Sequence, residues 1–291
     1  MREIILHCFE WKITHITSSL KDIKSQGFNS IQISPIQPCS KSEYWWALYQ
    51  PLGFTIGNRI GTKEDLIELC REAKKLDIKI IIDIVLRHVA TDDGQLIPSK
   101  DVDKSLIDNL NFFTNAENIK DYENRVDIYS NAIGLPMLNY NNIELQDIYI
   151  KFLQELKGCS VSGFRIDASK HFALSSEGSN FWERVFGQFK DMFNYAECLD
   201  CSMEILDEYT KFINVLTNDN ASDKSKMVIF IMSHDTELTF KSTLNMTDEI
   251  IISEWENLLK FYKTSHVLFY VRSFSNLWKS EAIRKINLEN R

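Results

Sequence analysis

Eight short apolar runs, separated by longer amphipathic stretches, constrain the fold of this chain more than any other feature of its sequence. Such alternation is typical of parallel strands joined by crossover helices, and eight units favour a closed (β/α)8 barrel, the TIM barrel, over an open sheet. A barrel of this kind takes about 250 residues, and the chain has 291. The predicted strands are residues 4–9, 30–33, 79–85, 163–166, 193–196, 212–216, 228–232 and 267–271, and the predicted helices are residues 13–26, 63–76, 143–157, 181–190, 247–262 and 277–287.

One polar segment interrupts this rhythm after the third predicted strand. Residues 89–137 are rich in aspartate and asparagine, and their apolar residues are sparse until the Leu135-Pro136-Met137 sequence. A connection of this length is longer than an ordinary barrel loop. We therefore predict a barrel formed by residues 1–88 and 138–291 and a short insertion at 89–137. We expect no C-terminal β-sandwich domain, because little more than one helix fits after the last strand.

The composition excludes several classes of partner. The formal net charge is −8 and the pI is about 5.4, whereas nucleic acids and anionic membranes attract basic surfaces. The sequence contains neither an apolar run of the roughly 18 residues that would span a membrane nor a secretory leader. We therefore expect a cytoplasmic protein, monomeric or homodimeric, with no nucleic-acid or membrane partner and with its six cysteines reduced.

Charged residues and histidines follow four of the predicted strands, at the points where those strands end. The carboxyl ends of barrel strands meet at one mouth, where barrel enzymes keep their active sites. At the end of the fourth strand, Arg165 and Asp167 are two residues apart and project from the same face, so we expect the guanidinium to lower the pKa of that carboxyl group. The residues at these four strand ends are Asp83 and His88, Arg165 and Asp167, Glu197, and His234 and Asp235.

These strand ends resemble the conserved segments of the α-amylase family of retaining glycoside hydrolases. Residues 83–88 are similar to the first segment of that family, 163–171 to the second, 195–199 to the third and 232–235 to the fourth, in the order that the family shows. Residues 45–51, with the sequence WWALYQP, also resemble an aromatic segment found in many amylases.

The resemblance implies roles for the residues at the barrel mouth. Asp167 would be the nucleophile, Glu197 the general acid and base, and Asp235 a third carboxylate that holds sugar hydroxyls. Retaining hydrolysis needs two carboxyl groups about 5 to 5.5 Å apart, and the apolar neighbours of Glu197 are expected to raise its pKa by desolvation. The implied substrate-binding residues are Tyr49, Trp46, His88, Arg165, Lys170, His171 and His234.

The aromatic residues of the WWALYQP segment have two interpretations. Their polar surroundings favour stacking on sugar rings, and we place Tyr49 on the ring next to the scissile bond. For Trp45 and Trp46, a hydrophobic cluster under a loop is an equal alternative. Three further tryptophans lie on helical patterns and are expected to pack in the core: Trp182, Trp255 and Trp278.

Two departures from the family concern a metal ion. Many α-amylases bind a structural calcium through an asparagine before the first-segment histidine and an aspartate before the fourth strand; the residues here are Arg87 and Met137. Calcium takes about six to eight oxygen ligands, so we expect neither calcium nor any other cofactor. We also expect the Arg87 side chain to fill the vacated space and tie the insertion to the barrel. The alternative is that it points to solvent.

Together these features predict a retaining hydrolase of α-1,4-glucosidic bonds in malto-oligosaccharides or starch-derived glucans, of the α-amylase type. A 4-α-glucanotransferase is an alternative, since it would use the same residues and pass the glycosyl group to a sugar instead of water. A barrel that binds glucan without cleaving it is a third hypothesis. The presence of Asp167, Glu197 and Asp235 argues against that third hypothesis.

Overall fold

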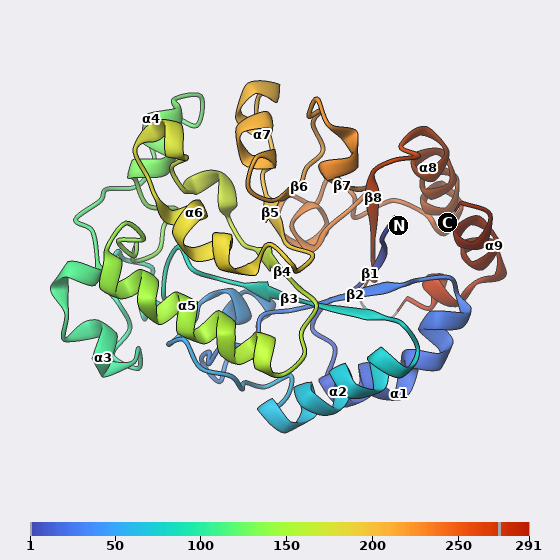
Figure 1. Ribbon diagram of the computed structural model, residues 1–291, viewed down its shortest axis with the longest axis horizontal. Helices are drawn as coiled ribbons and strands as arrows, with labels where there is room; N and C mark the ends of the chain where they lie inside the picture. The colour runs from blue at the N-terminus through green and yellow to red at the C-terminus, as the bar shows by residue number, and fades with distance from the viewer. Residues whose placement is uncertain (1, 273–274, 291) are drawn as a thin grey trace.

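A barrel of parallel strands organises the computed structural model, which describes residues 2–272 and 275–290. Within these residues, eight strands close in the order of the sequence, with helices around the outside (Figure 1). The first and last strands pair with each other, so that Ile4 lies opposite Val267. The predicted (β/α)8 barrel is therefore confirmed. The strands are β1 (Ile4–Cys8), β2 (Ser30–Ile33), β3 (Lys79–Ile84), β4 (Gly163–Ile166), β5 (Tyr195–Glu197), β6 (Asn214–Leu216), β7 (Met227–Phe230) and β8 (His266–Tyr270).

Helices connect the strands around the barrel. The α-helices are α1 (Ile13–Ser25), α2 (Lys63–Lys75), α3 (Lys104–Ile107), α4 (Arg125–Ser130), α5 (Ile143–Gly158), α6 (Phe181–Val185), α7 (Met203–Thr210), α8 (Asp248–Phe261) and α9 (Glu281–Glu289). Short 3₁₀ helices include η1 (Trp45–Tyr49), η2 (Leu110–Phe112), η3 (Ser169–His171), η4 (Ser175–Glu177), η5 (Phe186–Phe189), η6 (Lys224–Lys226) and η8 (Leu277–Lys279).

Two helical regions differ from the sequence prediction. The helix expected at residues 181–190 is divided into α6 and the 3₁₀ helix η5, and η5 contains Gly187, a residue that weakens an α-helix. Helix α7 is absent from the prediction, although a start signal is present. Its N-cap residue Ser202 accepts a hydrogen bond from the backbone N–H of Ile205, which is the ordinary way for serine to begin a helix.

Burial on both faces explains the continuous apolar character of the strands. Every residue of β1 and β2 is buried, because helices cover the outside of a parallel barrel and side chains fill its inside. The covering helices are amphipathic at helical spacing. Helix α1, for example, buries Ile13, Ile16, Leu20 and Ile23.

The segment between β3 and α5 leaves the regular barrel. It carries the short helices α3 and α4 and extends on the side away from α8 and α9 (Figure 1). Backbone bridges join His88 to Met137 and Phe113 to Leu138, so the segment returns to the place where it left the barrel. Part of it lies over the barrel mouth, where Tyr122 faces the cavity described below.

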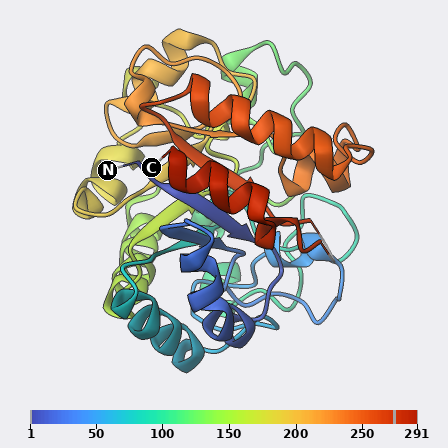
Figure 2. The same cartoon turned by 90° about the vertical axis from the view of Figure 1, so that its right-hand side faces the viewer.

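The first and last described residues lie side by side (Figures 1 and 2), and Arg2 NH1 donates to the carbonyl of Asn290 at 3.1 Å. The Trp255 indole donates a hydrogen bond of 2.9 Å to Asn287 Oδ1 and ties α8 to α9. Trp182, Trp255 and Trp278 are all buried, as predicted. Among the described helices, none is both long and apolar enough to cross a membrane.

Gly163 begins β4 at a place with no room for a side chain. An added Cβ atom would lie 1.9 Å from the carbonyl oxygen of Phe193. We predict that Gly163→Ala lowers the free energy of unfolding by at least about 2–3 kcal/mol, the cost of overpacking a core, as measured by urea denaturation. Gly158→Ala, at the end of α5, is the matched control, because its Cβ would meet no atom within 4 Å outside its own helical turn. Equal losses in the two variants would contradict this steric explanation.

Candidate active site

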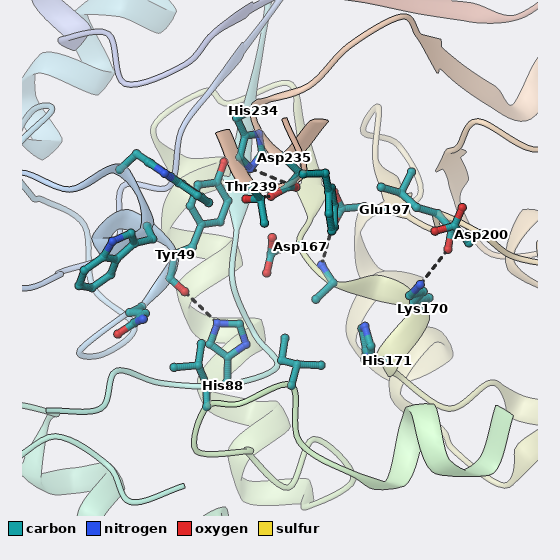
Figure 3. A pocket seen from close by; sticks show the side chains of 18 of the residues that line it. Tyr49, His88, Asp167, Lys170, His171, Glu197, Asp200, His234, Asp235 and Thr239 are labelled. Carbon is teal, nitrogen blue, oxygen red and sulfur yellow. Dashed lines mark hydrogen bonds and ion pairs between the residues drawn. The ribbon is translucent and has the colours of Figure 1, made fainter. Parts of the chain in front are cut away.

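A cavity of about 520 Å³ opens at the carboxyl ends of the strands (Figure 3). Figure 3 shows Asp167 at its centre, with Tyr49 on one side, Glu197 on the other, and Lys170 and His171 beyond Glu197. The barrel therefore gathers residues from distant parts of the chain at one mouth. Of the residues predicted to be catalytic or substrate-binding, all except Arg165 line this cavity: Asp167, Glu197, Asp235, Tyr49, Trp46, His88, Lys170, His171 and His234.

Arg165 lies beneath the cavity, with only 1% of its surface exposed. Its NH1 group donates to Asp83 Oδ1 and to Asp167 Oδ1, both at 2.8 Å, and its NH2 group is bonded to Glu197. The planar guanidinium has donors in fixed directions and can hold several carboxylates at once. Arg165 can therefore act on a substrate only through the carboxyl groups that it positions.

The strand register explains how these groups meet. Asp83 on β3 lies opposite Arg165 on β4, which in turn lies opposite Tyr195 on β5. Inward-pointing side chains of barrel strands form layers, so the Asp83 carboxylate and the guanidinium share the barrel interior. The Tyr49 hydroxyl donates to Asp83 Oδ2 at 2.9 Å. This bond connects the aromatic segment to the same network.

Burial dominates the titration of the three carboxyl groups bound to this guanidinium and of Asp235. Burial raises the pKa of Asp83 to about 8, although Arg165 opposes the shift. Burial also raises the pKa values of Asp167, Glu197 and Asp235, again against the charge of Arg165. Arg165 lowers the pKa of Asp167, as expected, but the loss of solvent outweighs that effect and the pKa is raised overall. The expected rise for Glu197 is confirmed.

The turn after β4 holds Glu197 from a second direction. Ala168 has a φ of 49°, and its backbone N–H donates to Glu197 Oε2 at 3.0 Å. A left-handed backbone at a residue other than glycine costs on the order of 1–2 kcal/mol, so the surrounding contacts must hold this turn in place. Because Arg165 binds the other oxygen, both oxygens of Glu197 are fixed.

Asp235 and His234 lie after β7, where Asp235–Thr239 forms a π-helical turn (η7). The Thr239 hydroxyl donates to Asp235 Oδ1 at 3.3 Å, and His234 Nε2 lies 3.4 Å from Asp235 Oδ2. Burial lowers the pKa of His234 to about 3, so the ring is neutral near pH 7. It stacks on Tyr49 with 5.0 Å between ring centroids. His234 thus adds a neutral, flat surface beside the carboxyl groups.

The aromatic segment forms another wall as the 3₁₀ helix η1. Tyr49 is buried, whereas Trp46 is 41% exposed and lies parallel to Tyr44, with ring centroids 5.6 Å apart. Trp45 packs edge-on against Tyr49 at 6.0 Å, and both tryptophans line the cavity. The exposure of Trp46 favours the stacking interpretation, since flat ring faces at a cavity edge suit the apolar faces of sugars. Trp45 agrees with both interpretations: it packs against Tyr49, as in a hydrophobic cluster, and it also lines the cavity, where it could meet a sugar ring.

Three more predicted binding residues lie around the carboxyl groups (Figure 3). His88 Nε2 lies 2.8 Å from the carbonyl oxygen of Tyr49, and because a carbonyl only accepts, this nitrogen carries the proton of the neutral ring. Burial lowers the pKa of His88 to about 4 and that of His171 to about 3, so both rings are neutral near pH 7. Lys170 Nζ donates to the Leu199 carbonyl at 3.1 Å and joins the turn after β4 to the loop after β5.

The cavity also contains residues that the sequence prediction did not include. Tyr122, from the insertion, is 57% exposed, and Phe240, directly after η7, is 71% exposed. Large exposed aromatic residues within polar segments are a recognisable signal of a binding surface. Leu199 and Asp200 also line the cavity, but their position depends on how the loop after β5 turns, which no residue pattern indicates.

The buried charge network predicts a large effect of removing its cation. In Arg165→Met, three carboxyl groups lose their common counter-charge, so we expect the free energy of unfolding at neutral pH to fall by about 3–5 kcal/mol. The carboxyl pKa values rise further in this variant. The deficit, which is the loss of unfolding free energy relative to the unmodified protein, is therefore greatest at high pH. It shrinks as pH falls, because the carboxyl groups take up protons.

Urea denaturation at about pH 5 and about pH 8 measures this deficit. Arg71→Met, which removes an exposed arginine paired with Glu68 on α2, is the control and should change the free energy by less than about 1 kcal/mol. A deficit of Arg165→Met that is the same at both pH values would argue against the charge explanation.

Comparison with known proteins identifies the family. Residues 12–267 match the family model described as "Alpha amylase, catalytic domain". The α-amylase of Clostridium acetobutylicum is 30% identical in an alignment that covers 98% of this chain and 43% of that protein. An α-amylase-related protein of Drosophila auraria is 30% identical over 59% of this chain and 37% of its own length. The chain thus spans about two fifths of the length of these relatives.

Solved structures share the fold. An α-amylase I mutant of Eisenia fetida, in complex with maltohexaose, gives a TM-score of 0.77 at 21% identity, over 94% of this chain and 68% of that chain. The α-amylase of Geobacillus thermoleovorans, complexed with acarbose, gives 0.75 at 18% identity, over 99% and 78%. The cyclomaltodextrin glucanotransferase CldA gives 0.72 at 17% identity, over 97% and 75%. The match to the family model over most of the sequence agrees with the closed barrel and its strand-end residues: this chain belongs to the α-amylase family.

Proposed function

We propose that the protein hydrolyses α-1,4-glucosidic bonds in malto-oligosaccharides or starch-derived glucans with retention of anomeric configuration, as an α-amylase-type glycosidase. The observation that carries this proposal is the placement of two carboxyl groups, Asp167 and Glu197, on the two terminal nitrogens of the Arg165 guanidinium at the cavity floor. Retaining enzymes keep their two carboxyl groups about 5 to 5.5 Å apart, whereas inverting enzymes leave room for a water molecule between them. A shared guanidinium favours the closer arrangement.

The proposed reaction has two displacements at one carbon. In the first, Asp167 attacks the anomeric carbon while Glu197 gives its proton to the glycosidic oxygen, so the leaving sugar departs with a new hydroxyl group and a glycosyl ester forms on Asp167. In the second, Glu197 takes a proton from water as the water oxygen attacks the same carbon, and the ester bond breaks to regenerate the Asp167 carboxylate. Two inversions at one carbon restore its original configuration.

The environments of the two carboxyl groups support these different roles. Arg165 donates a hydrogen bond to Asp167 and stabilises the anion that must attack. Glu197 has its pKa raised by burial and by the neighbouring charges of Asp167 and Asp235, against the effect of Arg165. Groups this close titrate as a unit. Loss of the first proton leaves one carboxylate and one acid, which is the state that the first displacement requires.

Several features of the cavity support a neutral glucan as the substrate. The rings of His88, His171 and His234 are neutral near pH 7, since burial lowers their pKa values, and they offer hydrogen bonds without a positive charge. Trp46 presents a flat apolar face at the edge of the cavity, as sugar rings require. The two α-amylase structures named above hold maltohexaose and acarbose, which supports the same class of ligand here.

A 4-α-glucanotransferase is the alternative function, with a hydroxyl group of a second glucan in place of water in the second displacement. The glucanotransferase CldA has the same fold, so the barrel suits either reaction. Incubation of the purified protein with maltoheptaose, followed by separation of products by size and anomeric form, distinguishes them. Shorter α-anomeric products are the expected result. Products longer than the substrate would indicate transfer, β-anomeric products would exclude retention, and the absence of any product would exclude both reactions.

We propose a cytoplasmic enzyme, monomeric or homodimeric, that acts on short soluble glucans. Its net charge of −8 supports the lack of a nucleic-acid partner. Size-exclusion chromatography with light scattering tests the oligomeric state.

Substitution of the two carboxyl groups should give distinguishable losses. Glu197→Gln removes the acid, so we expect kcat/KM on maltoheptaose to fall by about 10²–10⁴-fold, with a much smaller loss on α-maltosyl fluoride, whose leaving group needs no proton. Asp167→Asn removes the nucleophile and should abolish turnover of both substrates while sparing glucan binding. The control is Asp191→Asn, the same chemical change in an exposed pair with Lys157, which should leave activity unchanged. Equal losses of Glu197→Gln on both substrates would show that Glu197 is not the acid.

The pH profile of kcat/KM gives a second test of the same roles. Activity should fall as pH falls through the first pKa of the Asp167–Glu197 pair, because no carboxylate then remains to attack, and as pH rises through the second, because no proton then remains to be given. Burial raises both pKa values, so both limbs should lie above the ordinary values of about 3.9 and 4.3. In Glu197→Gln with α-maltosyl fluoride, the alkaline limb should disappear and the acid limb should remain. If the alkaline limb persists in that variant, it arises from a group other than Glu197.

A further inference from the structure

The position of the family's calcium site holds groups that do not suit a metal ion. Where the amylases that this chain resembles supply an asparagine and an aspartate, it has Arg87 and Met137. Calcium takes about six to eight oxygen ligands, whereas a guanidinium is a cation with no acceptor atom. In the described ranges 2–272 and 275–290, no group of three or more His, Cys, Asp or Glu side chains could hold a metal ion. The residues present therefore do not fit calcium.

Arg87 is buried at the junction of the barrel and the insertion, with 1% of its surface exposed. Its Nε group donates to the carbonyl of His171 at 2.8 Å, in the turn after β4. Its NH2 group donates to the carbonyls of Tyr129 at 2.9 Å and Asn131 at 3.0 Å, in the insertion. Three carbonyl oxygens from two segments thus converge on one positive charge, as they would on a metal ion. The alternative in which Arg87 points to solvent is wrong.

The surroundings of Arg87 stabilise a cation without a carboxylate. Burial lowers its pKa to about 10, so the guanidinium remains charged near pH 7. The ring of Tyr140 lies 5.1 Å and the ring of Phe172 5.9 Å from its central carbon, within the range of cation–π attraction. Carbonyl dipoles and ring faces together offset part of the cost of burying the charge, while the NH1 group has no hydrogen-bond partner among the described residues.

A second guanidinium binds the neighbouring residues of the same turn. Arg125, on α4 of the insertion, is bonded to the carbonyl of Lys170 and donates to the carbonyl of Phe172 at 2.7 Å. Its Nε group is fixed by Glu177 Oε1, also at 2.7 Å. Together with the bond from Arg87 to His171, the carbonyls of residues 170, 171 and 172 each accept from an arginine side chain.

We propose that Arg87 is a permanent structural cation that stands where a metal ion would, and that Arg87 and Arg125 together hold the turn of Lys170 and His171 against the insertion. This inference goes beyond the proposed reaction, because it concerns how one wall of the cavity is held, whatever bond is cleaved. The same turn includes Ala168, whose N–H binds Glu197. The two arginines therefore also support the position of that carboxyl group, and the shape of the cavity does not depend on calcium.

Thermal unfolding of the unmodified protein tests directly whether this wall of the cavity is held without a metal ion. The melting temperature should be the same with EDTA, with millimolar calcium chloride and with neither, and mass spectrometry of the native protein should find no stoichiometric calcium. A melting temperature that falls with EDTA or rises with calcium would overturn the proposal, as would one bound calcium per chain.

Arg87→Met tests whether the guanidinium supports the fold and the cavity wall. Three buried carbonyl oxygens lose their donor in this variant, so we expect the melting temperature to fall on the order of 10 °C and the KM for maltoheptaose to rise. The control is Arg71→Met, which removes an exposed arginine paired with Glu68 and Glu72 on α2 and should shift the melting temperature by no more than about 2 °C. Equal shifts in the two variants would show that Arg87 stabilises the fold no more than a surface arginine does.

The double variant Arg87→Asn with Met137→Asp tests whether the guanidinium occupies a metal position. It supplies the two oxygen-bearing side chains of the family and leaves the three carbonyl oxygens free, so calcium should raise its melting temperature while leaving that of the unmodified protein unchanged. No response of the folded double variant to calcium would overturn this part of the proposal. If the double variant does not fold without calcium but folds with it, the proposal is supported; if it folds in neither condition, the chelation experiment and Arg87→Met decide.

Discussion

The bonds of Arg165 to Asp83, Asp167 and Glu197 determine the geometry of the barrel mouth. They join carboxyl groups from three consecutive strands, because the strand register places Arg165 between β3 and β5. Burying such an ion costs several kcal/mol and is tolerated only where well-placed partners offset the cost. Arg165 can therefore be buried here only with these carboxyl groups beside it, and the contacts that offset its burial also set the positions of the two groups proposed to perform the reaction.

This network holds more carboxyl groups than one guanidinium can neutralise. Burial raises the pKa of Glu197, and the nearby Asp167 and Asp235 add to the effect, so the site retains a proton that an exposed glutamate would lose. The proton is what a general acid needs. Arg87 and Arg125 hold the adjoining turn by its backbone carbonyls. Buried positive charge thus positions both the carboxyl groups and the wall beside them.

Much of the barrel could be predicted from the sequence because strands buried on both faces are continuously apolar, which makes the polar residues after them easy to recognise. Asp167 and Glu197 are examples. Helix α7 is too short to show clear periodicity, and the position of Tyr122 depends on the path of the insertion. The net shift of the Asp167 pKa could not be predicted either, because the neighbouring Arg165 is visible in the sequence whereas the depth of burial is not.

Trapping of the glycosyl ester tests whether Asp167 is the nucleophile. The reagent 5-fluoro-α-maltosyl fluoride should form the ester, because its anomeric fluoride leaves without needing a proton. The ester should then hydrolyse slowly, because the ring fluorine destabilises the oxocarbenium-like transition state. Peptide mass spectrometry after denaturation should find one 5-fluoromaltosyl group per chain on Asp167, and no label in Asp167→Asn. A label on Glu197 or Asp235, or full hydrolytic activity in a protein that is never labelled, would show that Asp167 is not the nucleophile.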